Sequence, residues 1–479
     1  MDAGFQAHSS EKVRADHFLL SRVEGQEECK LAQMISYPPQ ARYAGNETLA
    51  RKLSLAIFLF CCVLFLGQGV RGERAFWHSC DYVPLYAGAR CMFTGCDPYS
   101  FPDIERQYYE HGGERVSSLN ARNQPLVNPP TTLLVVMPFS LFSFPIADML
   151  WLAAGGVLFC YAAYATLTLA ECAPSAVVLS CILLLTSPLL LMLGQSATMA
   201  IATMTIAIAL LLRGKWPWLA VSLLAISIAL KPHLVGLVLV YFLLQNRYRA
   251  RALQAIAAIA LLTVVSSLWV TVHPSSHRWV TELKATLASS VAPGGIDDPS
   301  PANPDSSSMA NLQVDASMLF PVGQMSTFSE NRHMANLIAW TVTAILVIGW
   351  LFGVSRARPT LENDLLAIAG VCCISLLPVY HRLYDTRLLL LTIPALALLL
   401  KRHRLVGGAA ACLTCLIFLS TNNLYAKLVR TIDLLIGRSS VIPVGRLAPL
   451  VVTLLAITYV VMYVFQNRNE SDLPRSVSA

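Results

Sequence analysis

Asp81 is the side chain in this sequence best placed to do chemistry. It follows the first membrane-length apolar run, Leu49 to Val70, and opens a polar, aromatic segment. A carboxylate just outside a bilayer can take a proton from a hydroxyl group and so act as a general base. The alternative is an ordinary solvated loop carboxylate. Asp97, in the same segment, lies between glycine and proline neighbours typical of a turn.

Further along the chain, polar residues interrupt the apolar stretches. A charged side chain at the centre of a membrane helix costs roughly 2.5–3.5 kcal/mol, so such residues tend to be paired or functional. Lys231 precedes a proline that frees backbone groups at the same depth, and a lysine in such a break suits a phosphate. The candidates for substrate binding are Asn128, Gln195, Lys231, His381, Arg382, Tyr384 and Asp385.

These candidates also have ordinary structural interpretations. Lys231 can extend its ammonium group to the headgroup region, and Gln195 can satisfy a helix end. A single histidine, such as His381, is by default a satisfied interfacial residue. Arg382 and Arg387 either bind an anionic headgroup or flank helix ends.

The elements that must position these residues are membrane helices. Hydrophobic residues make up 55% and charged residues 13% of the 479, and mean hydropathy is +0.57, whereas soluble domains carry about 25% charge. We therefore expect an all-α, polytopic membrane protein. The net charge of +7 needs no nucleic-acid partner, because lysine and arginine accumulate in cytoplasmic loops.

Four short basic segments set the expected topology: Arg213–Lys215, Arg247–Arg251, Arg356–Arg358 and Lys401–Arg404. Placing all four in the cytoplasm predicts about twelve spans, with cytoplasmic tails 1–48 and 467–479 and a membrane domain over 49–466. External loops then cover 71–128 and 273–335. The expected spans are 49–70, 149–170, 175–193, 196–212, 217–230, 233–245, 252–272, 336–354, 363–380, 386–400, 405–421 and 447–466.

Two loop features refine this topology. The apolar segment Pro129 to Phe144 does not fit as a full crossing, so we expect a re-entrant or interfacial element. Periodicity around Ile104 to Tyr109 predicts short amphipathic helices. Cys80, Cys91 and Cys96 share the first loop, and a disulfide between two of them is compatible with the sequence if that loop is extracytoplasmic, although the sequence does not decide whether one forms.

Taken in order, these residues resemble glycosyltransferase family 87. The resemblance rests on Asp81, Tyr86, Gly95 to Tyr99, Asn128 to Pro130, Gly194-Gln195, Leu230 to Pro232 and His381 to Asp385, and runs over about residues 49–400. Its members include the PimE-like, polyprenol-phosphate-mannose-dependent mannosyltransferases of the GT-C class. The resemblance implies a multi-helix GT-C membrane fold and an extracytoplasmic active site in the plasma (inner) membrane.

The resemblance also implies roles for individual residues. Asp81 matches the base in the first external loop, Lys231 a basic position that holds the carrier phosphate, and His381 a polar position beside the site. It implies an inverting transfer from a polyprenyl phosphate sugar to a glycolipid or glycan acceptor. We expect no metal and no cofactor, because no acidic Asp-x-Asp pair lies beside Asp81.

Two other classes of protein remain open on the residues alone. A transporter or flippase of a lipid-linked sugar would also use lysine, glutamine and histidine within the membrane. The absence of an evident internal repeat and the gathering of polar motifs on one face count against it. Among enzymes, a polymerase or ligase of lipid-linked glycans is the nearest alternative.

Overall fold

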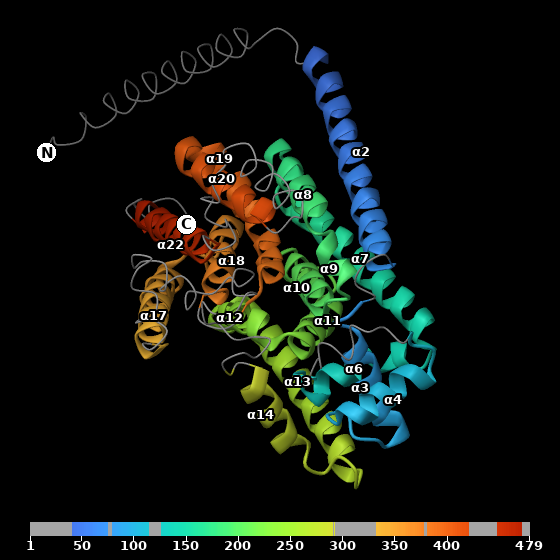
Figure 1. Ribbon diagram of the computed structural model, residues 1–479. Helices are drawn as coiled ribbons and strands as arrows, with labels where there is room; N and C mark the ends of the chain where they lie inside the picture. Colours follow the sequence, from blue (N-terminus) through green and yellow to red (C-terminus); the bar gives the residue numbers. More distant parts are fainter. Residues whose placement is uncertain are drawn as a thin grey trace, which may run out of the picture. The chain divides into compact units, whose positions relative to one another are not determined.

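The structure, a computed structural model, describes residues 41–74, 79–114, 126–290, 292, 332–377, 381–420 and 448–471. The chain divides into two units, residues 1–55 and 56–479, and all candidate site residues lie in the second. Every secondary-structure element in the described residues is a helix, which confirms the predicted all-α class (Figure 1).

Most of the described helices begin at or beside a proline, which fits the first turn of a helix. Their bounds are α2 (Ala41–Gly72), α3 (Val83–Thr94), α4 (Phe101–Glu110), α6 (Pro130–Ser140), α7 (Phe144–Leu169), α8 (Pro174–Thr186), α9 (Pro188–Met192), α10 (Ser196–Leu212), α11 (Pro217–Leu230), α12 (Pro232–Leu244), α13 (Asn246–Val272), α14 (Trp279–Ser290), α17 (Arg332–Arg356), α18 (Leu361–Ser375), the 3-10 helix η4 (Leu383–Thr392), α19 (Ile393–Arg402), α20 (Arg404–Ser420) and α22 (Ala448–Ser471).

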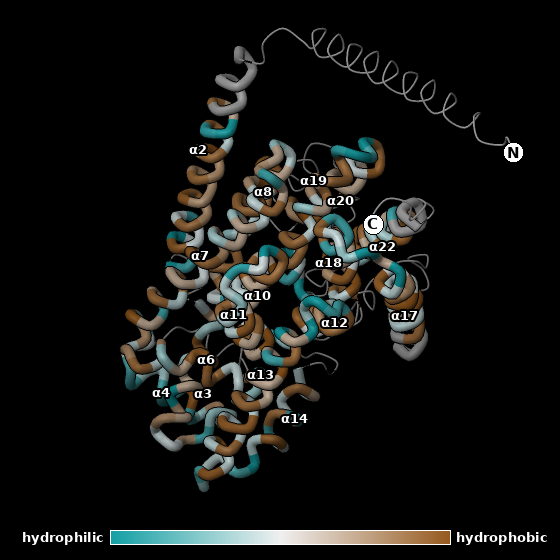
Figure 2. The backbone as a smooth tube through the Cα atoms, turned by 180° about the vertical axis from the view of Figure 1, so that it is seen from behind, coloured by the Kyte–Doolittle hydropathy of each residue, from teal (hydrophilic) through white to brown (hydrophobic). Residues whose placement is uncertain are grey.

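Six helices in the described residues are long and apolar enough to cross a membrane. They are Leu49–Gly72, Phe144–Leu169, Pro174–Met192, Asn246–Val272, Leu337–Arg356 and Ala448–Gln466. Hydrophobic residues dominate much of these helices (Figure 2). Shorter apolar helices, among them α10, α11 and α12, account for further predicted crossings. The multi-pass membrane class is therefore supported, and twelve crossings remain a prediction.

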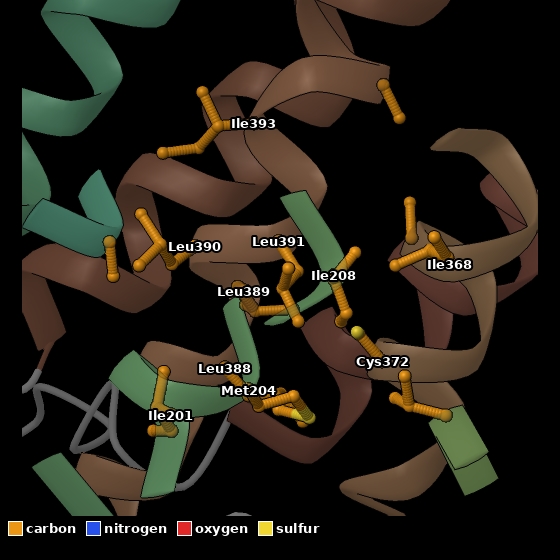
Figure 3. Packing of buried hydrophobic residues seen from close by; sticks show 14 of the residues in the cluster. Ile201, Met204, Ile208, Ile368, Cys372, Leu388, Leu389, Leu390, Leu391 and Ile393 are labelled. Atoms are coloured by element: carbon orange, nitrogen blue, oxygen red, sulfur yellow. The ribbon is translucent and has the colours of Figure 1, made fainter. Parts of the chain in front are cut away.

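The central core forms around α10. This helix packs against α7 and α11, while α18 packs against α12 and α22. Ile201, Met204 and Ile208 of α10 meet the leucine run of η4, and Ile368 and Cys372 of α18 lie beside them (Figure 3). Burying aliphatic side chains from three elements in one cluster fixes η4, and η4 carries two of the candidate site residues.

A second core lies next to Asp81 and combines residues of α3, α4 and α6 with residues of α7. The aromatic side chains Tyr82, Tyr86 and Tyr108 pack with Phe144 and Trp151. The predicted amphipathic helix is α4, with Ile104 and Tyr108 buried. Cys91 and Cys96 form a disulfide, one of the pairings that the sequence leaves open.

The structure also changes some predicted boundaries. The segment Pro129 to Phe144 contains a separate short helix, α6, in keeping with a non-crossing element, and α7 starts at Phe144 rather than 149. The predicted span 175–193 corresponds to the membrane-length stretch Pro174–Met192, within which α8 and α9 meet at Ser187. The predicted span 386–400 is divided between η4 and α19.

Candidate active site

Asp81 lies in the turn that leads into α3. The backbone of Tyr82 and Val83 turns back onto the carbonyl of Ser79, and α3 follows with a proline in its first turn. The backbone N–H of Asp81 donates to the carbonyl of Leu193 at 3.0 Å. The side chain of Asp81 is half-buried. Its position is thus set by the connection between α9 and α10 as well as by its own loop.

Gly194 allows the connection between α9 and α10 to lie close to the turn that carries Asp81. Its φ of +66° lies in the left-handed region, and a Cβ there would come within 2.8 Å of Tyr82 Cβ and 2.9 Å of Ser79 Cβ. The indole Nε1 of Trp151 donates to the carbonyl of Gly194 at 3.0 Å. Trp151 also stacks on Tyr82 at a ring distance of 4.9 Å. A side chain at position 194 would therefore displace the turn that carries Asp81.

Gln195 is brought directly to Asp81. It occupies the N-cap position of α10, with extended backbone. Its Nε2 donates a hydrogen bond to Oδ2 of Asp81. The buried amide therefore holds the orientation of the candidate base.

Lys231 lies at a break between two helices, as the sequence predicted. The helix α11 ends at Leu230 and α12 begins at Pro232, and Lys231 between them is non-helical, with φ −148° and ψ 81°. Its Nζ forms an ion pair of 2.8 Å with Oδ1 of Asp385, and the two side chains are 12% and 2% exposed. The ammonium group also lies 5.1 Å from the ring centroid of Tyr384.

Asp385 joins the remaining candidates into one cluster. Its Oδ2 lies 3.3 Å from Nδ1 of His381 and accepts the backbone N–H of Arg382 at 3.3 Å. Nε2 of the fully buried His381 lies 3.0 Å from the carbonyl oxygen of Ser375. Three of the predicted substrate-binding side chains, Lys231, His381 and Tyr384, are thus held around Asp385.

The Asp81–Gln195 pair and the Asp385 cluster lie at the same end of the α10–α11 helix pair. Ser227 of α11 donates to the carbonyl of Ala200 in α10 at 2.6 Å. Lys231 follows Ser227 by about one helical turn, and Gln195 precedes Ala200 by slightly more than one turn. Lys231 and Gln195 therefore each lie within about 8 Å of the Ser227–Ala200 contact, measured along the helix axis. The structure thereby brings a carboxylate and an ammonium group to one region.

Asn128 takes a supporting position. Its backbone carbonyl accepts a hydrogen bond from the Tyr99 hydroxyl at 3.0 Å. In the helix that follows, Thr132 donates to the carbonyl of Ala229 at 2.7 Å, near the end of α11. The Asn128-Pro-Pro segment therefore connects the loop that carries Tyr99 to the Lys231 break.

Of its two alternatives from the sequence, Arg387 takes the structural one. The side chain is 1% exposed and donates to backbone carbonyls of Thr186, at 2.6 Å, and of Phe418. It satisfies the ends of two neighbouring helices, in agreement with the structural alternative. Asp97 likewise forms the expected turn, in which its Oδ1 accepts the backbone N–H of Tyr99 at 2.9 Å.

His233, His381 and Asp385 place possible metal-ligand atoms within 4.8 Å of one another. Their existing contacts suit a metal ion poorly. Lys231 already supplies a positive charge to Asp385, and both ring nitrogens of His381 face oxygen atoms. A metal ligand must offer a lone pair, so an ion here would have to displace these contacts.

Sequence reasoning missed two contributors to the site. Trp151 lies inside a helix that reads as a plain apolar span, and Ser375 contributes only its carbonyl oxygen. A carbonyl has no residue-type signal. The Trp151 indole does give a signal in the sequence, because a buried indole N–H usually donates to an acceptor. The sequence does not identify that acceptor.

A family model of glycosyltransferase family 87 matches residues 126–377. The match covers more than half of the chain, so the protein is a membrane glycosyltransferase and belongs to glycosyltransferase family 87. Asn128, Gln195 and Lys231 lie within the matched segment, whereas Asp81 and Asp385 lie outside it. No curated protein and no solved structure matches the chain.

Proposed function

We propose that this protein transfers a sugar, mannose, from a polyprenyl phosphate carrier to a glycolipid or glycan acceptor. The observation that carries the proposal is the placement of the Asp81–Gln195 pair and the Lys231–Asp385 pair at one end of the α10–α11 helix pair. The first pair offers a positioned base, and the second offers a partly buried cation. The family membership supports the reaction class.

The proposed reaction is a single displacement at the anomeric carbon. The acceptor hydroxyl oxygen forms a bond to that carbon while the bond to the phosphate oxygen breaks on the opposite face of the sugar ring. Asp81 takes the hydroxyl proton, and the bonding electrons leave with the polyprenyl phosphate. A β-linked donor then gives an α-linked product.

Lys231 suits stabilisation of the leaving phosphate. An ammonium group has three N–H donors, and Asp385 accepts one of them at 2.8 Å. Because only 12% of the Lys231 side chain is exposed, its charge acts in a partly water-excluded region, where electrostatic stabilisation is stronger than in water. The scheme needs no metal ion, so chelation with EDTA should leave transfer unchanged.

The disulfide supports an extracytoplasmic site. The Cys91–Cys96 bridge lies at the end of α3, the helix that follows Asp81. Disulfides persist in oxidising compartments and are rare in the cytosol. We therefore place Asp81 on the outer side of the plasma membrane, where the product would enter cell-envelope glycolipid or glycan.

A labelling assay tests the function. Membranes that contain the protein are supplied with radiolabelled polyprenyl phosphomannose, and label is followed into glycolipid and glycan. Transfer of label to a new lipid or glycan supports the proposal. Label that crosses the bilayer still attached to its original carrier would identify a flippase instead.

A further inference from the structure

The exposed face of α2, continued to Arg74, lines a shallow and open surface hollow of about 740 Å³. The lining residues recur every three or four positions and therefore share one helix face. They are Val63, Leu66, Gly67, Val70, Arg71 and Arg74. The first four are apolar or lack a side chain, and the last two are basic. We call this face the α2 groove.

The apolar part of the α2 groove has room for a hydrocarbon chain. A Cβ added at Gly67 would meet nothing within 4 Å, so the helix face is open at that position. The span that carries the groove is only 28% buried inside the protein. Most of this helix is therefore presented to the surrounding lipid.

The charged end of the groove suits an anion. Arg71 and Arg74 are both exposed and one helical turn apart. Burial, followed by the nearby carboxyl group of Asp148, raises the pKa of Glu73 to about 7, so Glu73 carries less negative charge beside them than an ordinary glutamate.

The groove connects to the active site through α9. Cβ atoms added at Gly69 and Gly72 would come within 2.7 Å of Leu191 and 2.5 Å of Met192, so this end of α2 lies directly on α9. The next residue, Leu193, accepts the backbone N–H of Asp81 at 3.0 Å. Displacement of the end of α2 would thus be transmitted to the turn that carries the candidate base.

We propose that the α2 groove binds an anionic phospholipid of the bilayer, with one acyl chain along Val63 to Val70 and the phosphate on Arg71 and Arg74. The bound lipid holds the end of α2 against α9 and so supports the Asp81 turn. This site is separate from the donor-phosphate position at Lys231. Its occupancy does not depend on the proposed function, although its effect on transfer does.

Native mass spectrometry of the purified protein, in the absence of any sugar donor, tests the site. The protein is released from nanodiscs that contain phosphatidylcholine and phosphatidylglycerol in equal parts, and retained lipids are counted. The unaltered protein should retain phosphatidylglycerol in preference. Each basic residue near a membrane surface contributes about a factor of five to anionic lipid binding, so R71Q/R74Q should lose roughly tenfold or more of that preference.

Matched variants separate this site from general lipid binding. G67W should reduce retained phosphatidylglycerol, because its side chain fills the groove, whereas G236W should not, because Gly236 also faces open space but on α12. K215Q/R249Q removes two exposed basic residues elsewhere and should keep the preference. Equal loss of preference in R71Q/R74Q and K215Q/R249Q, or no loss in either, would overturn the proposal.

The transferase assay then tests whether lipid bound in the α2 groove affects catalysis at Asp81. In nanodiscs of phosphatidylcholine alone the unaltered protein should transfer more slowly than in mixed nanodiscs, and R71Q/R74Q should show no difference between the two. Because lipid retention is measured without donor, failure of transfer in every sample would count against the proposed function and leave the lipid result standing.

Discussion

Gln195 donates a hydrogen bond from Nε2 to Oδ2 of Asp81 across 114 residues of sequence. The bond joins the first residue before α10 to the turn before α3. The candidate base is therefore positioned by the helical core as well as by its own loop. A change in the α9–α10 connection should consequently alter catalysis without touching Asp81.

Gly194→Ala tests that positioning. The substitution forces a left-handed backbone on alanine and brings its Cβ to 2.8 Å from Tyr82 Cβ and 2.9 Å from Ser79 Cβ. A left-handed residue costs about 1–2 kcal/mol for backbone strain, and overpacking adds about 1–3 kcal/mol. We expect a lower thermal midpoint together with a fall in kcat of about 10²-fold, because misplacement of a catalytic group by 1 Å has that order of effect.

Gly214→Ala is the matched control. Gly214 has a similar φ of +62°, but a Cβ there meets nothing within 4 Å. It should show the backbone cost alone and retain kcat. If both variants lose kcat equally, the contact of Gly194 with Tyr82 and Ser79 has no part in positioning Asp81.

The Lys231–Asp385 ion pair leads to separate predictions for stability and for sugar transfer from the donor. Lys231→Ala leaves the buried Asp385 carboxylate without its ammonium partner, and loss of one member of a buried pair costs about 3–5 kcal/mol. The double variant Lys231→Ala/Asp385→Ala removes both charges and should regain much of that stability. Both variants should transfer poorly, because neither retains the cation for the donor phosphate.

Measurements of donor kinetics distinguish a role of Lys231 in donor binding from a purely structural role. Lys231→Arg keeps the charge and should keep part of the donor affinity, although its planar group cannot reproduce the geometry of an ammonium. A stable double variant with donor kinetics like those of the unaltered protein would assign Lys231 to structural pairing with Asp385.

Glu73 should make stability depend on pH. Burial and the neighbouring Asp148 raise the pKa of Glu73 from 4.5 to about 7 in the folded protein. Between these values the unfolded chain releases the proton while the folded protein holds it, so stability should fall as pH rises from about 4.5 to 7 and level off above. Thermal unfolding across this window measures the effect.

Glu73→Gln should remove that part of the pH dependence, because glutamine stays neutral and can still hydrogen-bond. Glu110→Gln, at an exposed position on α4, is the control and should leave the pH profile unchanged. Identical profiles for Glu73→Gln and the unaltered protein would show that Glu73 does not titrate in this window.

Much of the fold follows from simple sequence patterns. Low charge and long apolar runs indicate membrane helices, and the proline after Lys231 correctly predicts the break between α11 and α12. The pattern fails where it must distinguish a crossing from a buried helix. Helices such as α10 are apolar on every face and too short for a clear span, so hydropathy alone does not settle how they cross.

The candidate site was predicted in its members but not in its connections. Lys231, His381 and Asp385 stand out as polar residues in apolar surroundings, yet the ion pair at 2.8 Å joins positions 154 residues apart. Arg387 stands out equally, and its burial against the carbonyl groups of Thr186 and Phe418 is a tertiary fact with no local signal. A charged residue within an apolar sequence is a candidate for function, whereas its tertiary packing decides whether its role is catalytic or structural.

Asp81→Asn, assayed with polyprenyl phosphomannose in membranes, tests the central claim most directly. Asparagine keeps the size and can still meet Gln195 but does not take a proton as a carboxylate does, and loss of a positioned base removes about 10²–10⁴ in rate. Asp97→Asn and Asp103→Asn are the controls, because Asp97 caps its own turn and Asp103 pairs with Arg106. The account predicts that Asp81→Asn folds, binds donor and transfers almost nothing, while both controls stay active. Turnover by Asp81→Asn at the rate of the unaltered protein, with loss of activity in one of the controls, would contradict it.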